Sequence, residues 1–248
     1  MARVAVLGCG PAGLFAAYAL ELKGVTAMLF SRATKSKIAG AQYLHIPIFG
    51  LTGEEPDFTV KYEKWGSAQG YANKVYQNGR HPSSWNLWDE GEKPAWNLRR
   101  VYDTLWGMYS EKVNHVENIG TPTIDRLLPR FDLIINTLPK MHICKNPNHE
   151  FETVVVEIER VESELVPENT IIYNGIPLTE WHRASNIAGM ATREYRRGYG
   201  KGPAFTKPQA NNCDCWRGDV MPAGRNGKWK RDVLSHDAFT ETLQWFTV

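Results

Sequence analysis

The sequence has few cysteines and no long hydrophobic run. Its 248 residues include four cysteines, too few and too unevenly spaced for a disulfide scaffold. No apolar stretch is long enough to cross a bilayer, and the apolar start of the chain lacks the basic segment and cleavage site of a signal peptide. These absences argue against a disulfide-rich secreted domain and a membrane-spanning protein, and they predict a protein of the reducing cytoplasm.

An excess of charge of either sign is also absent. The formal net charge is +2, and the 42% hydrophobic and 23% charged residues are ordinary for a globular protein. A nearly balanced charge neither requires nor excludes a nucleic-acid partner. With this length and no internal repeat, the chain is expected to form one large domain, or one domain that carries an insertion.

The start of the chain carries the most informative motif. Val4–Leu7 is an uncharged apolar run, typical of a strand buried on both faces of a parallel sheet, and Leu14–Leu20 has the pattern of a buried helix. Between them, G-x-G-x-x-G spacing provides a tight turn, close approach of a pyrophosphate and close helix packing. The helix N-terminus attracts phosphate. The motif predicts a dinucleotide site with the cofactor-binding residues Gly8, Gly10, Pro11, Ala12 and Gly13.

A second strand is expected at Val25–Phe30, which completes a β-α-β unit. In units that bind FAD or NAD, this strand ends in an acidic residue that contacts the ribose hydroxyls. Here Ser31 and Arg32 stand in that place. Arg32 can meet the 2′-phosphate of NADP, or it can stack on an adenine while Ser31 reaches the ribose. The local motif does not distinguish these alternatives.

Hydrophobic periodicity is poor from about Lys35 to Arg130. At its start, Gly40, Ala41 and Gln42 are expected to form a second glycine-containing turn that approaches the cofactor. The region is rich in aromatic residues, which suit either a layer over a flat ligand or the core of a small inserted subdomain. These residues are Tyr62, Trp65, Tyr71, Tyr76, Trp85, Trp88, Trp96, Tyr102, Trp106 and Tyr109.

Two further stretches resemble a known flavoprotein superfamily. Phe131–Thr137 is similar to a buried strand, ending in threonine, that flavoproteins place next to FAD. Ala223–Trp229, with a helix expected from Leu234, resembles the closing motif of the FAD-dependent amine oxidase and UDP-galactopyranose mutase superfamily. With the N-terminal glycines, three stretches occur in the superfamily's order. The resemblance implies that FAD is contacted by Thr137, Gly224, Arg225 and the backbone from Leu234 to Asp237.

The resemblance also implies a fold class and a cofactor. The expected fold is α/β: a Rossmann-type FAD/NAD(P)-binding domain with a parallel sheet, formed by residues 1–41 and 130–248. Residues 42–129 would form a small aromatic-rich substrate or cap region. FAD is favoured over NADP because NADP alone does not explain the Gly224-Arg225 ending. The chain lacks the ribose carboxylate and is shorter than typical members, which implies a reduced substrate region.

The function implied by the resemblance is that of a FAD-dependent oxidoreductase of amine-oxidase-like type. Its substrate would be a small amine, or an amine linked to a nucleotide or to DNA, oxidised at the C–N bond or an adjacent C–H bond. One alternative is a non-redox flavin enzyme of mutase or lyase type. Another is a non-catalytic protein that keeps the dinucleotide fold for binding, including binding to nucleic acid.

Few catalytic side chains are expected, because a flavin itself accepts the hydride. His45, just after the second glycine turn, is the candidate acid or base, and His182 and His236 are comparable. Arg183 is the candidate for holding an anionic substrate group through a bidentate contact, and Arg193 is the alternative.

A zinc site is a separate prediction. Cys144 and His149 have Cys-x-x-x-x-His spacing, and Cys213 and Cys215 form a Cys-x-Cys pair. Together they make a Cys₃His set, which closed tetrahedral structural zinc sites use. Two alternatives are that His142 replaces His149 and that the thiols are free in ordinary loops.

Basic residues cluster toward the end of the chain, where tryptophans lie between them. Such a surface fits nucleic acid, and a solvated charged face is the alternative. The residues are Arg193, Arg196, Arg197, Lys201, Trp216, Lys228, Trp229, Lys230 and Arg231.

Overall fold

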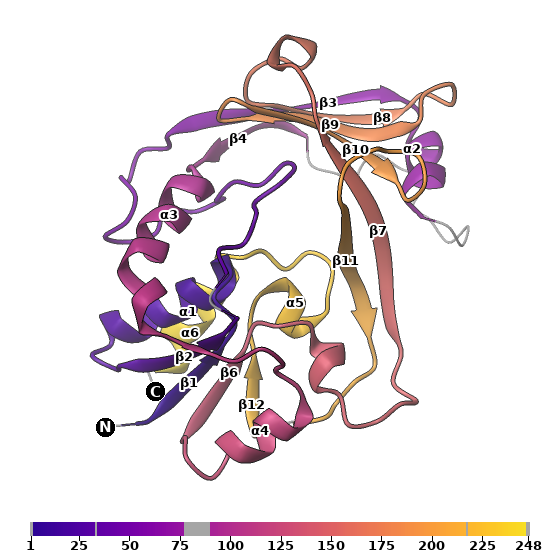
Figure 1. Ribbon diagram of the computed structural model, residues 1–248. Coiled ribbons are helices and arrows are strands. Elements are labelled where there is room, and N and C mark those ends of the chain that lie inside the picture. The colour runs from indigo at the N-terminus through magenta and orange to yellow at the C-terminus, as the bar shows by residue number, and fades with distance from the viewer. Residues whose placement is uncertain (1, 33, 77–89, 217, 247–248) are drawn as a thin grey trace. The chain divides into compact units, whose positions relative to one another are not determined.

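The computed structural model of the protein describes residues 2–32, 34–76, 90–216 and 218–246. Trp85 and Trp88, two of the aromatic residues named above, lie outside the described residues. The chain divides into two compact units, each assembled from separate parts of the sequence (Figure 1). Unit 1 comprises Met1–Lys37, Arg100–Thr153 and Pro208–Val248, and unit 2 comprises Ile38–Arg99 and Val154–Lys207.

Unit 1 is built on a parallel sheet. Its strands are β1 (Val4–Leu7), β2 (Ala27–Ser31), β5 (Val113–His115), β6 (Leu133–Asn136) and β12 (Val220–Pro222). They lie in the order β12-β6-β1-β2-β5, with every neighbouring pair parallel. The chain leaves β1 toward β2 on one side, and β6 returns on the other. Ligands bind at such a reversal of strand order, beyond the carboxyl ends of the strands.

Helices pack around this sheet. They are α1 (Pro11–Leu22), α3 (Leu98–Tyr109), α4 (Thr121–Leu127), α5 (Gly224–Lys228) and α6 (Asp237–Trp245), with short 3₁₀ helices η2 (Ser110–Lys112) and η3 (Lys140–Ile143). The apolar helix α1 is buried from Gly13 to Leu20 and packs against α6, where Tyr18 stacks on Phe239. Among the described residues, no helix has the length and apolar character needed to cross a bilayer.

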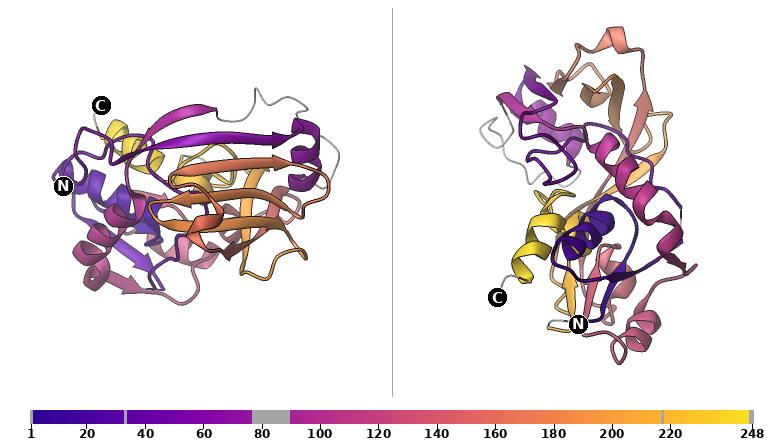
Figure 2. Two further views of the ribbon diagram at one scale, coloured as in Figure 1. Left: turned by 90° about the horizontal axis from the view of Figure 1, so that it is seen from above. Right: turned by 90° about the vertical axis from the view of Figure 1, so that its left-hand side faces the viewer.

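Unit 2 contains most of a seven-stranded mixed sheet, onto which the left view of Figure 2 looks; residues 151–153 and 208–211 of its strands belong to unit 1. Its strands are β3 (Phe58–Gly66), β4 (Gly91–Ala95), β7 (Phe151–Arg160), β8 (Thr170–Gly175), β9 (Trp181–Ile187), β10 (Met190–Arg196) and β11 (Ala204–Asn211). The order is β11-β7-β10-β9-β8-β3-β4, in which β3 and β8 pair in parallel. Helix α2 (Ala68–Val75) packs on β8, and the 3₁₀ helix η4 spans Ser163–Leu165.

The structure confirms the α/β class and the parallel Rossmann-type sheet, but it divides the chain differently from the predicted boundaries. Residues 100–129 belong to unit 1, because they supply β5 and the helices beside it. Residues 154–207 belong to unit 2, because their strands pair with one another and with β3. Pairing between strands that are distant in the sequence decides which unit each segment joins. Local periodicity carries no information about that pairing.

Replacing Gly107 by alanine is expected to raise the free energy of unfolding by about 0.5–1 kcal/mol. Gly107 lies in α3, is exposed, and has open space where a Cβ would stand. Alanine lowers the conformational entropy of the unfolded chain and introduces no clash. Urea unfolding measures the change. A lower midpoint at unchanged slope would contradict the prediction.

Candidate functional site

The turn between β1 and α1 is shaped by its glycines. Gly8 has a φ of +99°, and a Cβ there would lie 2.6 Å from Thr137 Oγ1. A Cβ on Gly13 would lie 1.9 Å from the Gly8 carbonyl oxygen, so α1 packs directly on the end of β1. Helix α1 starts with Pro11 after an N-cap Gly10 that provides no side-chain cap. The N–H groups of its first turn therefore suit an anionic ligand.

Thr137 ties β6 to this turn. Its Oγ1 donates to the carbonyl oxygen of Leu7 at 2.7 Å, and its backbone N–H donates to the same oxygen at 3.0 Å. The hydroxyl thus holds the carboxyl ends of β1 and β6 together at the turn. It supports the shape of the predicted cofactor site from the protein side.

Tyr102, on α3, also fixes this turn, and sequence reasoning did not identify it as a site residue. Its hydroxyl donates to the carbonyl oxygen of Cys9 at 3.1 Å and accepts the backbone N–H of Ser36 at 2.9 Å. The side chain is almost fully buried. Because residues 100–129 were assigned to the insertion, no sequence signal linked this tyrosine to the glycine turn.

The C-terminal motif meets the same turn. Gly224 has a φ of +65°, and a Cβ there would lie 2.5 Å from the Cβ of Ala12. Arg225 follows in α5 and donates to the carbonyl oxygen of Pro208 at 3.2 Å. Contact between Gly224 and Ala12 brings the two ends of the chain together at the candidate cofactor site.

The predicted start of the C-terminal helix at Leu234 was wrong. Helix α6 begins at Asp237, with His236 as its N-cap residue, and not at Leu234. The Leu234 N–H donates to Asp237 Oδ2 at 2.8 Å, which occupies the backbone group that the resemblance assigned to FAD. A side-chain acceptor three residues away therefore takes this N–H.

At the end of β2, Ser31 and Arg32 differ in their surroundings. The Ser31 hydroxyl oxygen accepts from the Cys9 thiol at 3.0 Å, so Ser31 faces the glycine turn. Arg32 is exposed. This placement is compatible with either sequence hypothesis, because the guanidinium can reach a 2′-phosphate or stack on a base.

Gly40, Ala41 and Gln42 are the residues predicted to form a second glycine-containing turn that approaches the cofactor. They belong to unit 2, where Gly40 has a φ of +74° and a Cβ would lie 2.7 Å from Glu194 Oε1. Gln42 Nε2 donates to the carbonyl oxygen of Ala39 at 2.8 Å. The predicted boundary, which included Gly40 and Ala41 in the nucleotide-binding domain, was therefore wrong, because Gly40 packs on β10 in unit 2. Their approach to the cofactor stays a prediction.

Unit 2 contains a buried charge cluster centred on Glu194 of β10, whose side chain is 2% exposed. Its carboxylate accepts from Arg183 on β9 and from Lys207 on β11. His182 Nε2 lies 3.7 Å from the same carboxylate. Within the described residues, His182 Nδ1 and Arg183 Nε have no hydrogen-bond partner. Arg183 was a predicted site residue, whereas Glu194 and Lys207 were missed because the alternation of β10 does not single out a buried glutamate.

The charges of this cluster set its protonation states. Burial alone would raise the pKa of Glu194, but Arg183 and Lys207 hold that pKa well below its ordinary value. Burial lowers the pKa of His182 to about 4, although Glu194 opposes this shift. Near neutral pH the cluster therefore contains one carboxylate, two cations and a neutral imidazole.

The other side chains predicted at the site make different contacts. His45 is half-buried in unit 2 and stacks on Tyr43, with ring centroids 4.3 Å apart. Arg193 lies over the ring of Trp181. His236 is buried in unit 1 at the start of α6. Arg183 is the predicted site residue for which the structure shows a buried carboxylate partner.

The tryptophans expected on the basic surface are buried. Trp216 is 7% exposed and Trp229 is 2% exposed, so neither ring is available to stack on a nucleic-acid base. Trp216 packs in the apolar core of unit 1, and Trp229 Nε1 donates to the carbonyl oxygen of Glu152. Their role is core packing, which a local mixture of aromatic and basic residues does not reveal.

The four predicted zinc ligands come together in unit 1. Cys144, His149, Cys213 and Cys215 place their candidate ligand atoms within 4.8 Å of one another. His142, the alternative histidine, is exposed and is not part of this group. The segments after η3 and after β11, which are about seventy residues apart in the chain, form one compact side-chain cluster.

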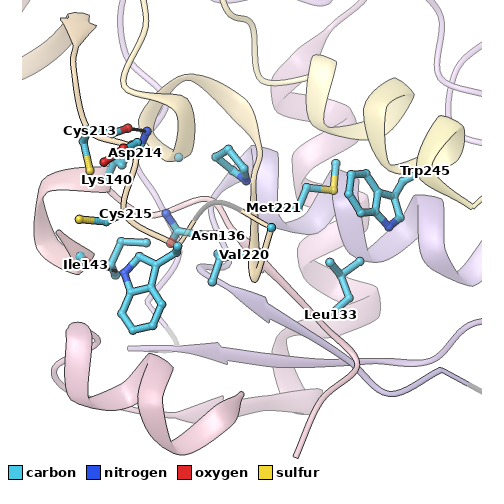
Figure 3. A pocket seen from close by; sticks show the side chains of 14 residues that line it. Leu133, Asn136, Lys140, Ile143, Cys213, Asp214, Cys215, Val220, Met221 and Trp245 are labelled. Carbon is cyan, nitrogen blue, oxygen red and sulfur yellow. Dashed lines mark hydrogen bonds between the residues drawn. The ribbon is translucent and has the colours of Figure 1, made fainter. Parts of the chain in front are cut away.

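A pocket of about 400 Å³ lies beside this cluster (Figure 3). Cys213, Asp214 and Cys215 line one end, and Met221 and Trp245 lie toward the other. The residues of the glycine turn do not line it. The pocket is therefore distinct from the candidate cofactor site.

Comparisons with known proteins identify the fold. No family model matches the sequence, and no curated protein does. Reduced UDP-galactopyranose mutase superposes with a TM-score of 0.54 at 10% identity, over 99% of this chain and 95% of that one. A variant of MHPCO, a 2-methyl-3-hydroxypyridine-5-carboxylic acid oxygenase, gives 0.53 at 15% identity, over 99% and 81%. The chain shares the fold of these two proteins. A variant of HpxO from Klebsiella pneumoniae, complexed with FAD, gives 0.50 at 10% identity, over 99% and 80%. At these identities the similarity establishes the fold and not the reaction.

Proposed function

We propose that this protein is a FAD-dependent oxidoreductase that acts on a small molecule. The observation that carries the proposal is the glycine turn of unit 1, where Gly8 and Gly13 leave no room for a Cβ and α1 begins without a side-chain cap. A dinucleotide pyrophosphate fits this cradle. The shared fold supports the choice of FAD, because the similar HpxO structure is a complex with FAD.

The residues of unit 1 fit the cofactor in a defined way. The backbone from Gly10 to Gly13 would hold the phosphates, and Ser31 with Arg32 would take the part of the missing ribose carboxylate. Gly224 keeps the C-terminal turn in contact with Ala12 and so shapes the same cradle. Bound FAD would supply hydride acceptance.

Unit 2 offers the groups that suit an anionic substrate. Arg183 and Lys207 outnumber their shared partner Glu194, and both side chains are 23% exposed. The surplus positive charge would attract a carboxylate or phosphate, and the planar guanidinium suits bidentate binding. The specific reaction we propose is oxidation of a C–N bond, or an adjacent C–H bond, in a small or nucleotide-linked amine that carries such a group. The resemblance of the C-terminal motif supports this choice, whereas the shared fold supports only a flavin enzyme. No observation on the described residues favours a nucleic-acid partner, which the proposed function does not include.

Purified protein is expected to show flavin absorption and to release FAD, identified by mass. Gly10→Ala is expected to weaken FAD binding at least about tenfold, equivalent to about 1.4 kcal/mol, because a Cβ blocks close approach of the pyrophosphate. In the protein that Cβ would lie 3.3 Å from Ser36 Oγ, so the fold itself should tolerate the change. Titration of the FAD-free protein with FAD measures both affinities.

Gly107→Ala is the matched control, because it adds the same methyl group in open space and should leave FAD affinity unchanged. A colourless protein that neither takes up FAD nor gains thermal stability from it would refute the proposal. Retention of FAD without bleaching by any carboxylate- or phosphate-bearing amine, under anaerobic conditions, would overturn the proposed reaction and leave the non-redox and binding alternatives.

A further inference from the structure

We propose that Cys144, His149, Cys213 and Cys215 bind one zinc ion in a closed structural site. This inference does not depend on the proposed flavin chemistry, because all four residues lie in unit 1 away from the glycine turn and can be tested by metal content alone.

The spacing of the candidate ligand atoms fits a tetrahedral ion. Zinc–sulfur bonds of about 2.3 Å and a zinc–nitrogen bond of about 2.0 Å separate two sulfurs by about 3.8 Å, and sulfur from nitrogen by about 3.5 Å. The Cys144 sulfur lies 3.5 Å from that of Cys213 and 3.9 Å from that of Cys215. His149 Nδ1 lies 3.3 Å from the Cys144 sulfur and 3.6 Å from the Cys215 sulfur. Four of the six separations thus match those of a tetrahedral zinc ion, and the other two are no longer than 4.8 Å.

The groups around the ligands also suit a bound metal. The other ring nitrogen of His149, Nε2, lies 3.6 Å from Asp214 Oδ1. A carboxylate that approaches this nitrogen favours an imidazole whose other nitrogen binds a metal.

The charge of the site is compensated nearby. A zinc ion with three thiolates and a neutral imidazole carries one negative charge. Lys140 Nζ donates to Asn211 Oδ1 and to the carbonyl oxygen of Cys213, and Figure 3 shows Lys140 beside Cys213. Lys145 lies over the ring of Trp216, next to the ligand Cys144. Lys140 therefore contacts the backbone of one ligand residue, and Lys145 directly follows another in the chain.

The position of the site in the chain defines its role. Two ligands follow η3, after β6, and two precede β12, which pairs with β6 at the edge of the parallel sheet. Closing a loop of this length through a metal stabilises the fold, because the unfolded chain has no preformed site. All four coordination positions come from the protein, so no position remains for a catalytic water. The ion would pin β12, which leads directly to Gly224.

The test is the zinc content of the full-length protein, purified without chelator and measured by elemental mass spectrometry. We expect one zinc ion per chain in the wild type. Cys213→Ser and His149→Ala should lose the ion and lower Tm. His149→Cys should retain it, because four thiolates also form a closed zinc site. His142→Ala is the matched control: it removes an exposed histidine from the same segment and should keep both zinc and Tm.

The variants separate a metal site from a merely structural cluster. Wild-type protein with four free thiols and no metal would overturn the proposal, as would a disulfide between two of these cysteines or iron in place of zinc. Retention of zinc by His149→Ala, or loss of zinc by His142→Ala, would overturn the ligand assignment. If Cys213→Ser does not fold, the comparison of His149→Ala with His149→Cys decides the matter, and FAD content plays no part in it.

Discussion

Glu194→Gln is expected to lower the free energy of unfolding by about 3–5 kcal/mol. The substitution keeps the size of the side chain but leaves Arg183 and Lys207 without the carboxylate that both contact. Removing one partner from a buried ion pair is strongly destabilising, because the remaining charge is no longer compensated. Urea unfolding of wild type and variant, followed by circular dichroism, measures the difference. Glu168→Gln, at an exposed position, is the matched control and should change stability little.

The same pair of proteins should show a characteristic pH dependence. The folded-state pKa of Glu194 is below its ordinary value of 4.5. The stabilisation that its ionised carboxylate provides is therefore complete above pH 4.5 and is lost as the pH falls further. The difference between wild type and Glu194→Gln should stay constant from neutral pH down to about 5 and shrink below about 4.5. Both proteins should lose stability as the pH falls below 6.5, because the pKa of His182 is lowered to about 4. A difference that shrinks already between pH 7 and 6 would contradict this account.

Gly13→Ala is expected to lower the free energy of unfolding by about 3 kcal/mol or more and to abolish FAD binding. The added Cβ would stand 1.9 Å from the Gly8 carbonyl oxygen, so α1 would have to move away from the end of β1. That movement would open the turn that is proposed to hold the pyrophosphate. Unfolding in urea and FAD titration measure the two effects separately.

Gly107→Ala again provides the contrast. Both substitutions add one methyl group to a helical glycine, but only Gly13 has a carbonyl oxygen in the way. The structure therefore predicts opposite signs for the two changes in stability. Equal stability of Gly13→Ala and wild type would show that α1 does not pack on β1 as described.

Several features of this protein were determined by short stretches of sequence. The glycine turn follows from residues 4–20, because strand, turn and helix are adjacent in the chain and each has its own local pattern. Strand β6 followed from the apolar run of Phe131–Thr137, and Thr137 contacts the end of β1. Its contact with FAD stays a prediction. The Cys₃His cluster could also be predicted, because residue type and spacing restrict metal ligands strongly even when the two halves are distant.

Other features were decided only by the tertiary structure. Gly40 has the local character of a cofactor turn, yet its place in unit 2 depends on Glu194, which is more than 150 residues away. Tyr102 reaches the glycine turn through a hydrogen bond to Cys9, and no pattern within α3 indicates this contact. Local sequence determines which residues can form a strand, a helix or a turn. Which sheet receives each strand, and which buried charges meet, depends on pairing and packing between distant segments, where the free energy of burial is gained only once the whole unit has formed.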